Sequence, residues 1–270
     1  MFQPIPIPRE LRLPRLFLLF PLYFCSTTPP MTTLCLDFGN TRLKYAVFAG
    51  DDMTHIDVLE TGSVEEVAAV LDKHRPGKSI LSSVVSHDEA LEPMLSEKTS
   101  FHKLSHLSKL PFTVPVGKPE TMGADRIALA AAMVKFHPGR NNLVIGLGTA
   151  ITYNFINKYN EFLGGGISPG MEMRLKSLRD YTAKLPLVKK DWNFPLIGYD
   201  TRTNILSGVI LGMAKEIDGT IDAYRERYGN FNAVLTGGDS LYFAQHLKNT
   251  IFADPDFLYK GLYAISTYND

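Results

Sequence analysis

The chain has 270 residues, of which 45% are hydrophobic and 21% are charged, as is ordinary for a folded protein with a buried core. Its 28 lysines and arginines balance its 28 aspartates and glutamates, so no net field attracts nucleic acid or an anionic membrane, and we expect neither as a partner. The cysteines, Cys25 and Cys35, give neither a disulfide framework nor a metal-ligand spacing, which favours a cytoplasmic protein.

Residues 1–30 differ in character from the rest of the chain. Basic residues precede an apolar stretch from Leu16 to Cys25, which resembles a signal peptide and is too short to span a bilayer as a helix. Met31 opens "MTTLCLDFGN", a natural start for a cytosolic protein whose first element is a strand. We therefore expect residues 1–30 to be a disordered leader or the result of a mis-assigned start codon, with secretion as the alternative.

The first half of the remaining chain alternates strands and helices. Its expected elements are strands at 32–38, 43–49, 55–61 and 79–85, and helices at 64–74, 88–98 and 127–137. Ser63 and Glu66 have the spacing of a capping box at the start of the first helix. The alternation indicates an α/β sheet.

The strand pattern begins again after "HPGRNN". The stretch "NLVIGLGTAITYNFINKYNEFLGGGISPG" predicts strand, glycine turn, strand, turn and strand, with Gly146 at the place of Asp37. A long helical stretch from Thr201 to Tyr228 follows, with Gly219 as the candidate for a break. We therefore expect a duplicated α/β core, with one lobe at residues 31–140, a second at 141–270, and a cleft between them.

Three glycine turns end predicted strands: "DFGNT" from Asp37, "GTA" from Gly148 and "TGGD" from Thr236. Such turns expose backbone N–H groups and admit an anion where a Cβ would obstruct it, so together they favour a clamp on a nucleotide polyphosphate. Asp37 could then hold Mg²⁺ at the phosphates, although a capping aspartate in a simple turn is the other interpretation. None of the turns has the Walker A pattern.

The sequence "GADR" (Gly123–Arg126) places an acidic and a basic residue, Asp125 and Arg126, at the N-terminus of an apolar helix. Asp125 could accept a proton from an attacking hydroxyl, while Arg126 binds an anionic group on the acceptor. The simpler interpretation is that Asp125 favours the helix N-terminus electrostatically and Arg126 pairs with an acid.

Taken in order, "DFGNTRLK", "GADR", "GLGTA" and "GGGISPG", extended by "DTRTNILSG" and "TGGDS", resemble the signatures of type III pantothenate kinases. These belong to the acetate and sugar kinase/heat-shock 70/actin superfamily. The resemblance implies a duplicated ribonuclease-H-like (actin-like ATPase) fold, a homodimer, and transfer of the γ-phosphoryl of ATP to pantothenate, the first step of coenzyme A biosynthesis.

The resemblance also implies roles for individual residues. Asp125 would be the catalytic proton acceptor. The ATP-binding residues would be Asp37, Phe38, Gly39, Asn40, Thr41, Arg42, Leu43, Lys44 and Thr149. The pantothenate-binding residues would be Val116, Gly123, Ala124, Asp125, Arg126 and Thr201. Asp37 would hold the Mg²⁺.

Two positions depart from the family pattern. Gly146 stands where the family has an aspartate associated with K⁺ or NH₄⁺, and Val116 stands where the family commonly has tyrosine. Because the first phosphate loop and Asp125 are retained, we expect an active kinase with altered cation dependence. The alternatives are a degenerate, non-catalytic member that acts as a regulatory accessory factor, and a kinase of the same superfamily for another hydroxylated acid or sugar.

Overall fold

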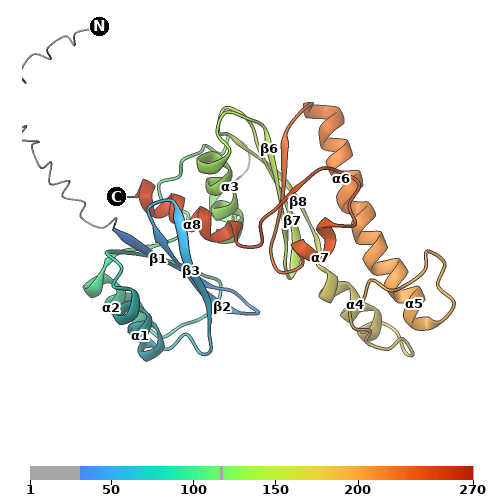
Figure 1. Cartoon of the computed structure of the whole chain (residues 1–270), viewed down its shortest axis with the longest axis horizontal. Helices are drawn as coiled ribbons and strands as arrows, with labels where there is room; N and C mark the ends of the chain where they lie inside the picture. The colour runs from blue at the N-terminus through green and yellow to red at the C-terminus, as the bar shows by residue number, and fades with distance from the viewer. Residues whose placement is uncertain (1–30, 116–117, 270) are drawn as a thin grey trace, which may run out of the picture. The chain divides into compact units, whose positions relative to one another are not determined.

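The structure is a computed structural model that describes residues 31–115 and 118–269 (Figure 1). The prediction of a leader at residues 1–30 and the predicted substrate position Val116 lie outside these residues. Within the described ranges, no helix combines the length and the apolarity needed to cross a membrane.

The first sheet has the strand order β3-β2-β1-β4-β5. Its strands are β1 (Thr32–Phe38), β2 (Leu43–Ala49), β3 (Asp52–Leu59), β4 (Lys78–Ser83) and β5 (Ser100–Lys103). β1 pairs antiparallel with β2 and parallel with β4, and the helices α1 (Val64–His74) and α2 (Leu91–Lys98) make the parallel crossovers. The sequence patterns predict every strand but β5.

The start of α1 shows how local chemistry sets an element. Ser63 caps the helix by accepting a hydrogen bond from the Glu66 backbone, as the sequence predicts. The Glu66 carboxylate, however, turns back to accept from the backbone N–H groups of residues 60–62. It therefore fixes the chain entering the helix instead of closing the predicted capping box.

The second sheet repeats the first. Its order is β8-β7-β6-β9-β10, the same pattern when the strands are counted from the start of each half. The strands are β6 (Asn142–Leu147), β7 (Ala150–Ile156), β8 (Phe162–Pro169), β9 (Asn232–Thr236) and β10 (Phe252–Ala253). Pairing directions also match, because β6 runs antiparallel to β7 and parallel to β9. This confirms the predicted duplicated ribonuclease-H-like fold.

Two helices of distant sequence pack together against the sheets. α3 (Ala124–Phe136) contacts β6 and β7, and α8 (Phe257–Tyr268) contacts α3, β1 and β4 (Figure 1). Gly261 lets the two helices approach closely, since a Cβ there would lie 1.9 Å from the Ala128 carbonyl oxygen. The C-terminal helix thus joins the core of the first sheet. The lobe limits at residues 140 and 141 stay a prediction.

The other face of the second sheet carries the remaining helices. These are α4 (Met171–Asp180), α5 (Thr201–Leu206), the π-helical turn η2 (Ser207–Leu211), α6 (Gly212–Tyr228) and α7 (Ser240–Ala244); a short 3₁₀ turn, η1 (Pro119–Thr121), precedes α3. The predicted break near Gly219 is wrong, because Gly219 lies inside α6. The irregularity falls at Ser207–Leu211, where a glycine weakens regular helix formation.

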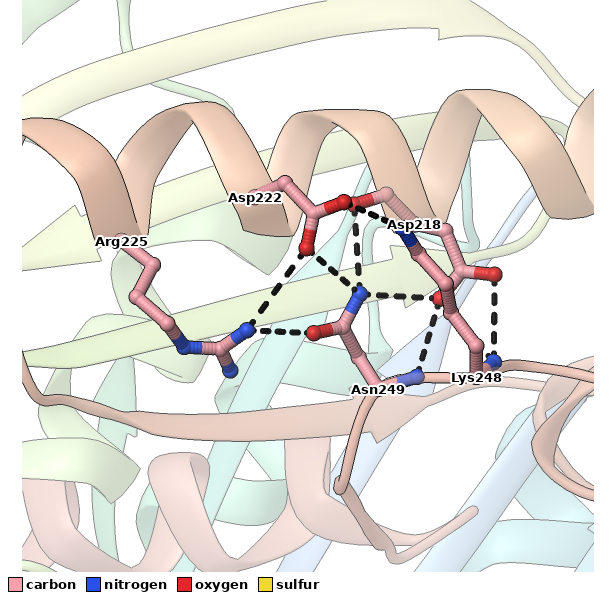
Figure 2. Close-up of polar contacts among 5 residues, drawn as sticks. All are labelled: Asp218, Asp222, Arg225, Lys248 and Asn249. Carbon is pink, nitrogen blue, oxygen red and sulfur yellow. Dashed lines mark hydrogen bonds and ion pairs between the residues drawn. The ribbon is translucent and has the colours of Figure 1, made fainter.

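A polar cluster anchors the segment after α7 to α6 (Figure 2). The buried Asp218 carboxylate accepts hydrogen bonds from the backbone N–H groups of Lys248 and Asn249 and from the Asn249 side chain. One turn later, Asp222 pairs with Lys248 and accepts from Asn249. Because the buried carboxylate is satisfied by these donors, we interpret the cluster as structural.

Candidate functional site

The duplicated topology brings equivalent residues to one edge of each sheet. At the end of β1, Asp37 lies opposite Lys44 of β2 and Ser82 of β4. At the end of β6, Gly146 lies opposite Thr152 of β7 and Thr236 of β9 in the same pattern. The carboxyl ends of adjacent parallel strands thus place polar side chains together in both halves, where α/β sheets bind ligands.

These two edges line a single cavity of about 510 Å³. The predicted site residues that line it are Asp37, Gly39, Asn40, Thr41, Arg42, Lys44, Asp125, Gly146 and Thr149. Gly237 and Gly238 of the third glycine turn line it too, so all three turns meet at this cavity.

The glycine turns are fixed by contacts with each other and with neighbouring strands. Gly39 donates its backbone N–H to the Arg42 carbonyl, which closes the first turn. Gly237 has φ +93°, and a Cβ there would lie 2.4 Å from the Leu147 carbonyl oxygen at the end of β6. Both the backbone conformation and the space therefore require glycine at this position. The turns present backbone to the cavity, as anion binding needs.

Asp37 is the most perturbed carboxylate at the cavity. Burial, together with the nearby Asp125 charge, raises the pKa of Asp37 from 3.8 to about 6. Lys44 and a hydrogen bond from Ser82 oppose that rise in pKa without cancelling it. Asp37 thus stays largely ionised at neutral pH in a setting that disfavours its charge. Such a carboxylate gains by binding a cation.

Asp125 stands at the first turn of α3 and is exposed at the cavity. Its carboxylate lies against Gly123, the N-cap of the helix, and a Cβ on Gly123 would come within 2.6 Å of Asp125 Oδ1. A larger residue at position 123 would therefore displace the Asp125 carboxylate from its observed position. The two acids, Asp37 and Asp125, enter the cavity from different elements of the fold.

Arg126 does not line the cavity but lies directly behind it. Its Nε donates to Asn154 Oδ1 of β7 at 2.7 Å, and its guanidinium carbon lies 5.4 Å from the centre of the Phe162 ring. Burial lowers the pKa of Arg126, which remains a cation at neutral pH. Within the described ranges, no carboxylate forms an ion pair with it.

The other predicted site residues lie elsewhere. Phe38 is buried in the core of the first lobe and Leu43 packs beside it. Gly123 and Ala124 begin α3 without lining the cavity. Thr201 is exposed and lines a separate cavity of about 560 Å³ beside α4 and α5. The structure of one chain therefore does not bring Thr201 to the carboxylates.

Among the polar residues that line the cavity, Ser82, Thr152 and Tyr259 were not predicted from the sequence. Ser82 follows an apolar run at the end of β4 and Thr152 lies near the start of β7, so the strand pattern could have revealed both had the pairing been known. Tyr259 comes from α8, and the Asp37 carboxylate and burial both raise its pKa. No local pattern marks this tyrosine.

The Asp37 carboxylate could hold a divalent cation with the help of phosphate oxygens and water. Among the residues described, no group of three or more His, Cys, Asp or Glu side chains could enclose a metal by itself. That donor set fits Mg²⁺, which binds one or two carboxylates and takes its other ligands from phosphates and water.

Comparison with known proteins gives a consistent result. Residues 33–223 match the family model for type III pantothenate kinase. A type III pantothenate kinase from Christiangramia forsetii is 44% identical over 238 residues, which are 87% of this chain and 98% of that protein. One from Flavobacterium johnsoniae is 41% identical over 231 residues, 85% of this chain and 95% of that protein.

A Baf family protein from Campylobacter jejuni has a similar solved structure. The TM-score is 0.56, the sequence identity is 20%, and the alignment covers 87% of this chain and 98% of that one. This similarity concerns the fold alone. The family model spans both halves of the chain and includes the first two glycine turns and the GADR segment. On this combination of fold, cavity and sequence similarity, the chain belongs to the type III pantothenate kinase family.

Proposed function

We propose that this chain phosphorylates pantothenate with ATP and thereby catalyses the first step of coenzyme A biosynthesis. The observation that carries the proposal is the cavity in which Asp37 and Asp125 meet three glycine turns. The named relatives are type III pantothenate kinases at up to 44% identity over almost their whole length. ATP and a divalent metal follow from the kinase chemistry, and we take the metal to be Mg²⁺.

In this proposal the glycine turns receive the phosphates. Backbone N–H groups of residues 40–42 and of Thr149, with Lys44, stabilise the negative charge of the polyphosphate. Asp37 would hold the Mg²⁺, and the bound ion supplies charge neutralisation at the transferred phosphoryl group. Lys44 and the hydrogen bond from Ser82 favour the ionised form of the Asp37 carboxylate, which that role requires.

The acceptor binds on the α3 side. Asp125 would orient the primary hydroxyl of pantothenate and accept its proton, and Arg126 would attract the carboxylate of pantothenate. Gly123 and Ala124 would contact the substrate through the backbone at the start of α3. Because little covalent chemistry is asked of the protein, catalysis rests on positioning and on charge stabilisation.

An assay of ATP-dependent pantothenate phosphorylation tests the proposal directly. We expect turnover with pantothenate and Mg²⁺, and much less with sugars or other hydroxylated acids. A folded protein without turnover under any cation condition would instead support the non-catalytic accessory role. Turnover restricted to another hydroxylated acceptor would identify a different kinase of the superfamily.

The monovalent cation gives a separate prediction. A Cβ at Gly146 would lie 2.8 Å from Thr152 Oγ1, so the threonine hydroxyl stands beside the place where the family has its aspartate. We propose that this substitution weakens dependence on K⁺ or NH₄⁺. Gly146→Asp should raise the ratio of kcat/KM in K⁺ to that in tetramethylammonium severalfold, because it restores a cation ligand. The uncharged Gly146→Asn is the matched control, and an equal salt response of both variants would contradict the account.

We further propose a homodimer in the cytoplasm. Large exposed apolar side chains concentrate in the segment around α4 and α5: Met173, Tyr181, Leu187, Leu196, Ile197 and Tyr199. Exposed apolar groups at this density are typical of an interface. Thr201 lies in the same region. If it contacts the substrate, it would have to do so in the site of the partner subunit, across the interface.

Ile197→Glu should convert the dimer to a monomer, because it places a charge in the interface. Light scattering after size-exclusion chromatography measures the mass against the 30.1 kDa of one chain. Leu107→Glu, at another highly exposed leucine in the first lobe, is the control. A wild-type protein that is monomeric at micromolar concentration would refute the interface.

A further inference from the structure

Asn154 is a buried carboxamide that connects two parts of the site. It lies in the middle of β7 and is fully buried. Its Oδ1 accepts the hydrogen bond from Arg126 Nε at 2.7 Å. Its Nδ2 donates to Thr152 Oγ1 at 3.1 Å and to the Val144 carbonyl at 3.3 Å. One side chain thus joins the arginine behind the cavity to a threonine in the cavity wall.

The chemistry of this position requires an amide. The Val144 carbonyl can only accept, so the Asn154 nitrogen must face it and the Asn154 oxygen must face Arg126. Both amide protons are used, and the orientation is therefore fixed. A carboxylate in the same place could not donate to Val144, and it would neutralise the guanidinium that it touches.

The uncharged partner preserves the charge of Arg126. The guanidinium is half-buried against Phe162, and its Nε is committed to Asn154. Its other nitrogens have no carboxylate partner within the described ranges. Arg126 is thus held by a neutral acceptor from one side. The nearby Asp125 charge acts on the guanidinium without forming an ion pair in the described ranges, so Arg126 can still attract a further anion.

We infer that Asn154 is a positioning residue that sets the specificity of this site for an anionic acceptor, by orienting Arg126 without neutralising it. The inference rests on the proposed function, since it assigns the carboxylate of pantothenate to Arg126. Through Thr152 the same amide fixes the wall of the cavity where the phosphates would bind. The buried Asn154 side chain therefore contacts both the arginine assigned to the acceptor and the threonine on the phosphate side of the site.

The test compares two acceptors, pantothenate and its uncharged alcohol analogue pantothenol. The wild-type enzyme should prefer pantothenate in kcat/KM. Asn154→Asp should lower kcat/KM for pantothenate about tenfold to a hundredfold, mainly through KM, because a hydrogen-bonded charge interaction is lost. The kcat/KM for pantothenol should fall less, because only the contact of Thr152 with the phosphate side is disturbed for this acceptor, and the ratio of kcat/KM for pantothenate to that for pantothenol should therefore fall. The ratio of the two values is independent of the folded fraction of a preparation, so partial unfolding cannot mimic the effect.

Asn154→Ala extends the test if the aspartate variant folds poorly, and it should reduce the ratio by loosening Arg126. Asn142 offers a matched control on β6. It is a buried carboxamide that donates to the His137 and Arg140 carbonyls and accepts from Asn232, at the opposite end of the strand from Gly146. Asn142→Ala should destabilise the protein and leave the acceptor ratio unchanged.

The outcomes separate the inference from the proposed function. A wild-type enzyme that phosphorylates neither acceptor refutes both. A wild-type enzyme that uses the two acceptors equally well refutes the inference, because Arg126 then binds no carboxylate. A preference for pantothenate that survives in Asn154→Asp and Asn154→Ala, or that falls equally in Asn142→Ala, overturns the inference and leaves the kinase function intact.

Discussion

Asp125→Asn should lower kcat by roughly two to four orders of magnitude, since the amide cannot accept the proton of the attacking hydroxyl. The loss should appear in kcat, with binding of Mg²⁺–ATP largely retained, because the glycine turns and Asp37 are unchanged. The fold should also be retained, as the Asp125 side chain is exposed. Steady-state kinetics with pantothenate, together with calorimetric titration of a non-hydrolysable ATP analogue, measure the two effects separately.

The same variant should report the coupling between the two acids. The Asp125 charge contributes to the raised pKa of Asp37, so its removal should move that pKa down from about 6. The pH at which Mg²⁺–ATP binding is lost should fall with it. Glu120→Gln removes an exposed acid from η1 and is the control for a general change in charge. If Asp125→Asn turned over almost normally, another group would have to take the proton.

Asp37→Asn should abolish most Mg²⁺-dependent activity. The variant loses the carboxylate that we assign to the metal, and we expect kcat/KM for ATP to fall at least about a hundredfold, more than for the loss of an outer-shell partner. In the wild-type enzyme, kcat/KM for ATP should also decrease below pH 6, since protonation removes the same ligand. A profile that stays flat from pH 8 to pH 5 would show that Asp37 is not the ligand.

Asp37→Asn should at the same time stabilise the ligand-free protein above pH 6. The folded state holds the Asp37 proton more tightly than the unfolded state, because the pKa is raised from 3.8 to about 6. Stability therefore decreases as pH rises through that interval and stays lower above it. The shift corresponds to at most about 3 kcal/mol at pH 8, which the neutral variant would recover.

Denaturant unfolding of both proteins at pH 8 and pH 4 measures this effect. We expect the variant to be more stable at pH 8 and much closer to the wild type at pH 4, where Asp37 of the wild type is protonated in the folded state and partly protonated in the unfolded state. Asp72→Asn changes an exposed aspartate whose partner is Lys98 and should show no such pH dependence. A stability difference that is independent of pH would contradict the burial argument.

The fold and half of the site were predictable because their signals are local. Alternation of apolar residues predicts the hairpins at Asp37 and Gly146, and glycines mark the turns where the chain reverses. Since the duplicated order then places both strand ends at one cavity, the local patterns were enough to select Asp37 and Thr149 as neighbours, whereas the family resemblance was needed to add Asp125.

The remaining site residues depend on long-range packing that no local pattern records. Ser82 reaches Asp37 only because β4 pairs with β1 in a particular register. Tyr259 arrives from a helix more than two hundred residues away in the sequence. The buried Asn154 looked like any polar residue on a strand, since its significance lies in the Arg126 side chain that it meets from α3.

The position of α8 has a consequence for how the protein is made. The apolar side of the first sheet is covered in part by residues 257–268, which leave the ribosome only after the whole second sheet. The first sheet therefore stays incompletely packed until the whole second sheet and α8 have been synthesised. Chaperone contact and exposure to proteases should concentrate in this interval, and a prematurely terminated chain would lack both Tyr259 and a finished first core.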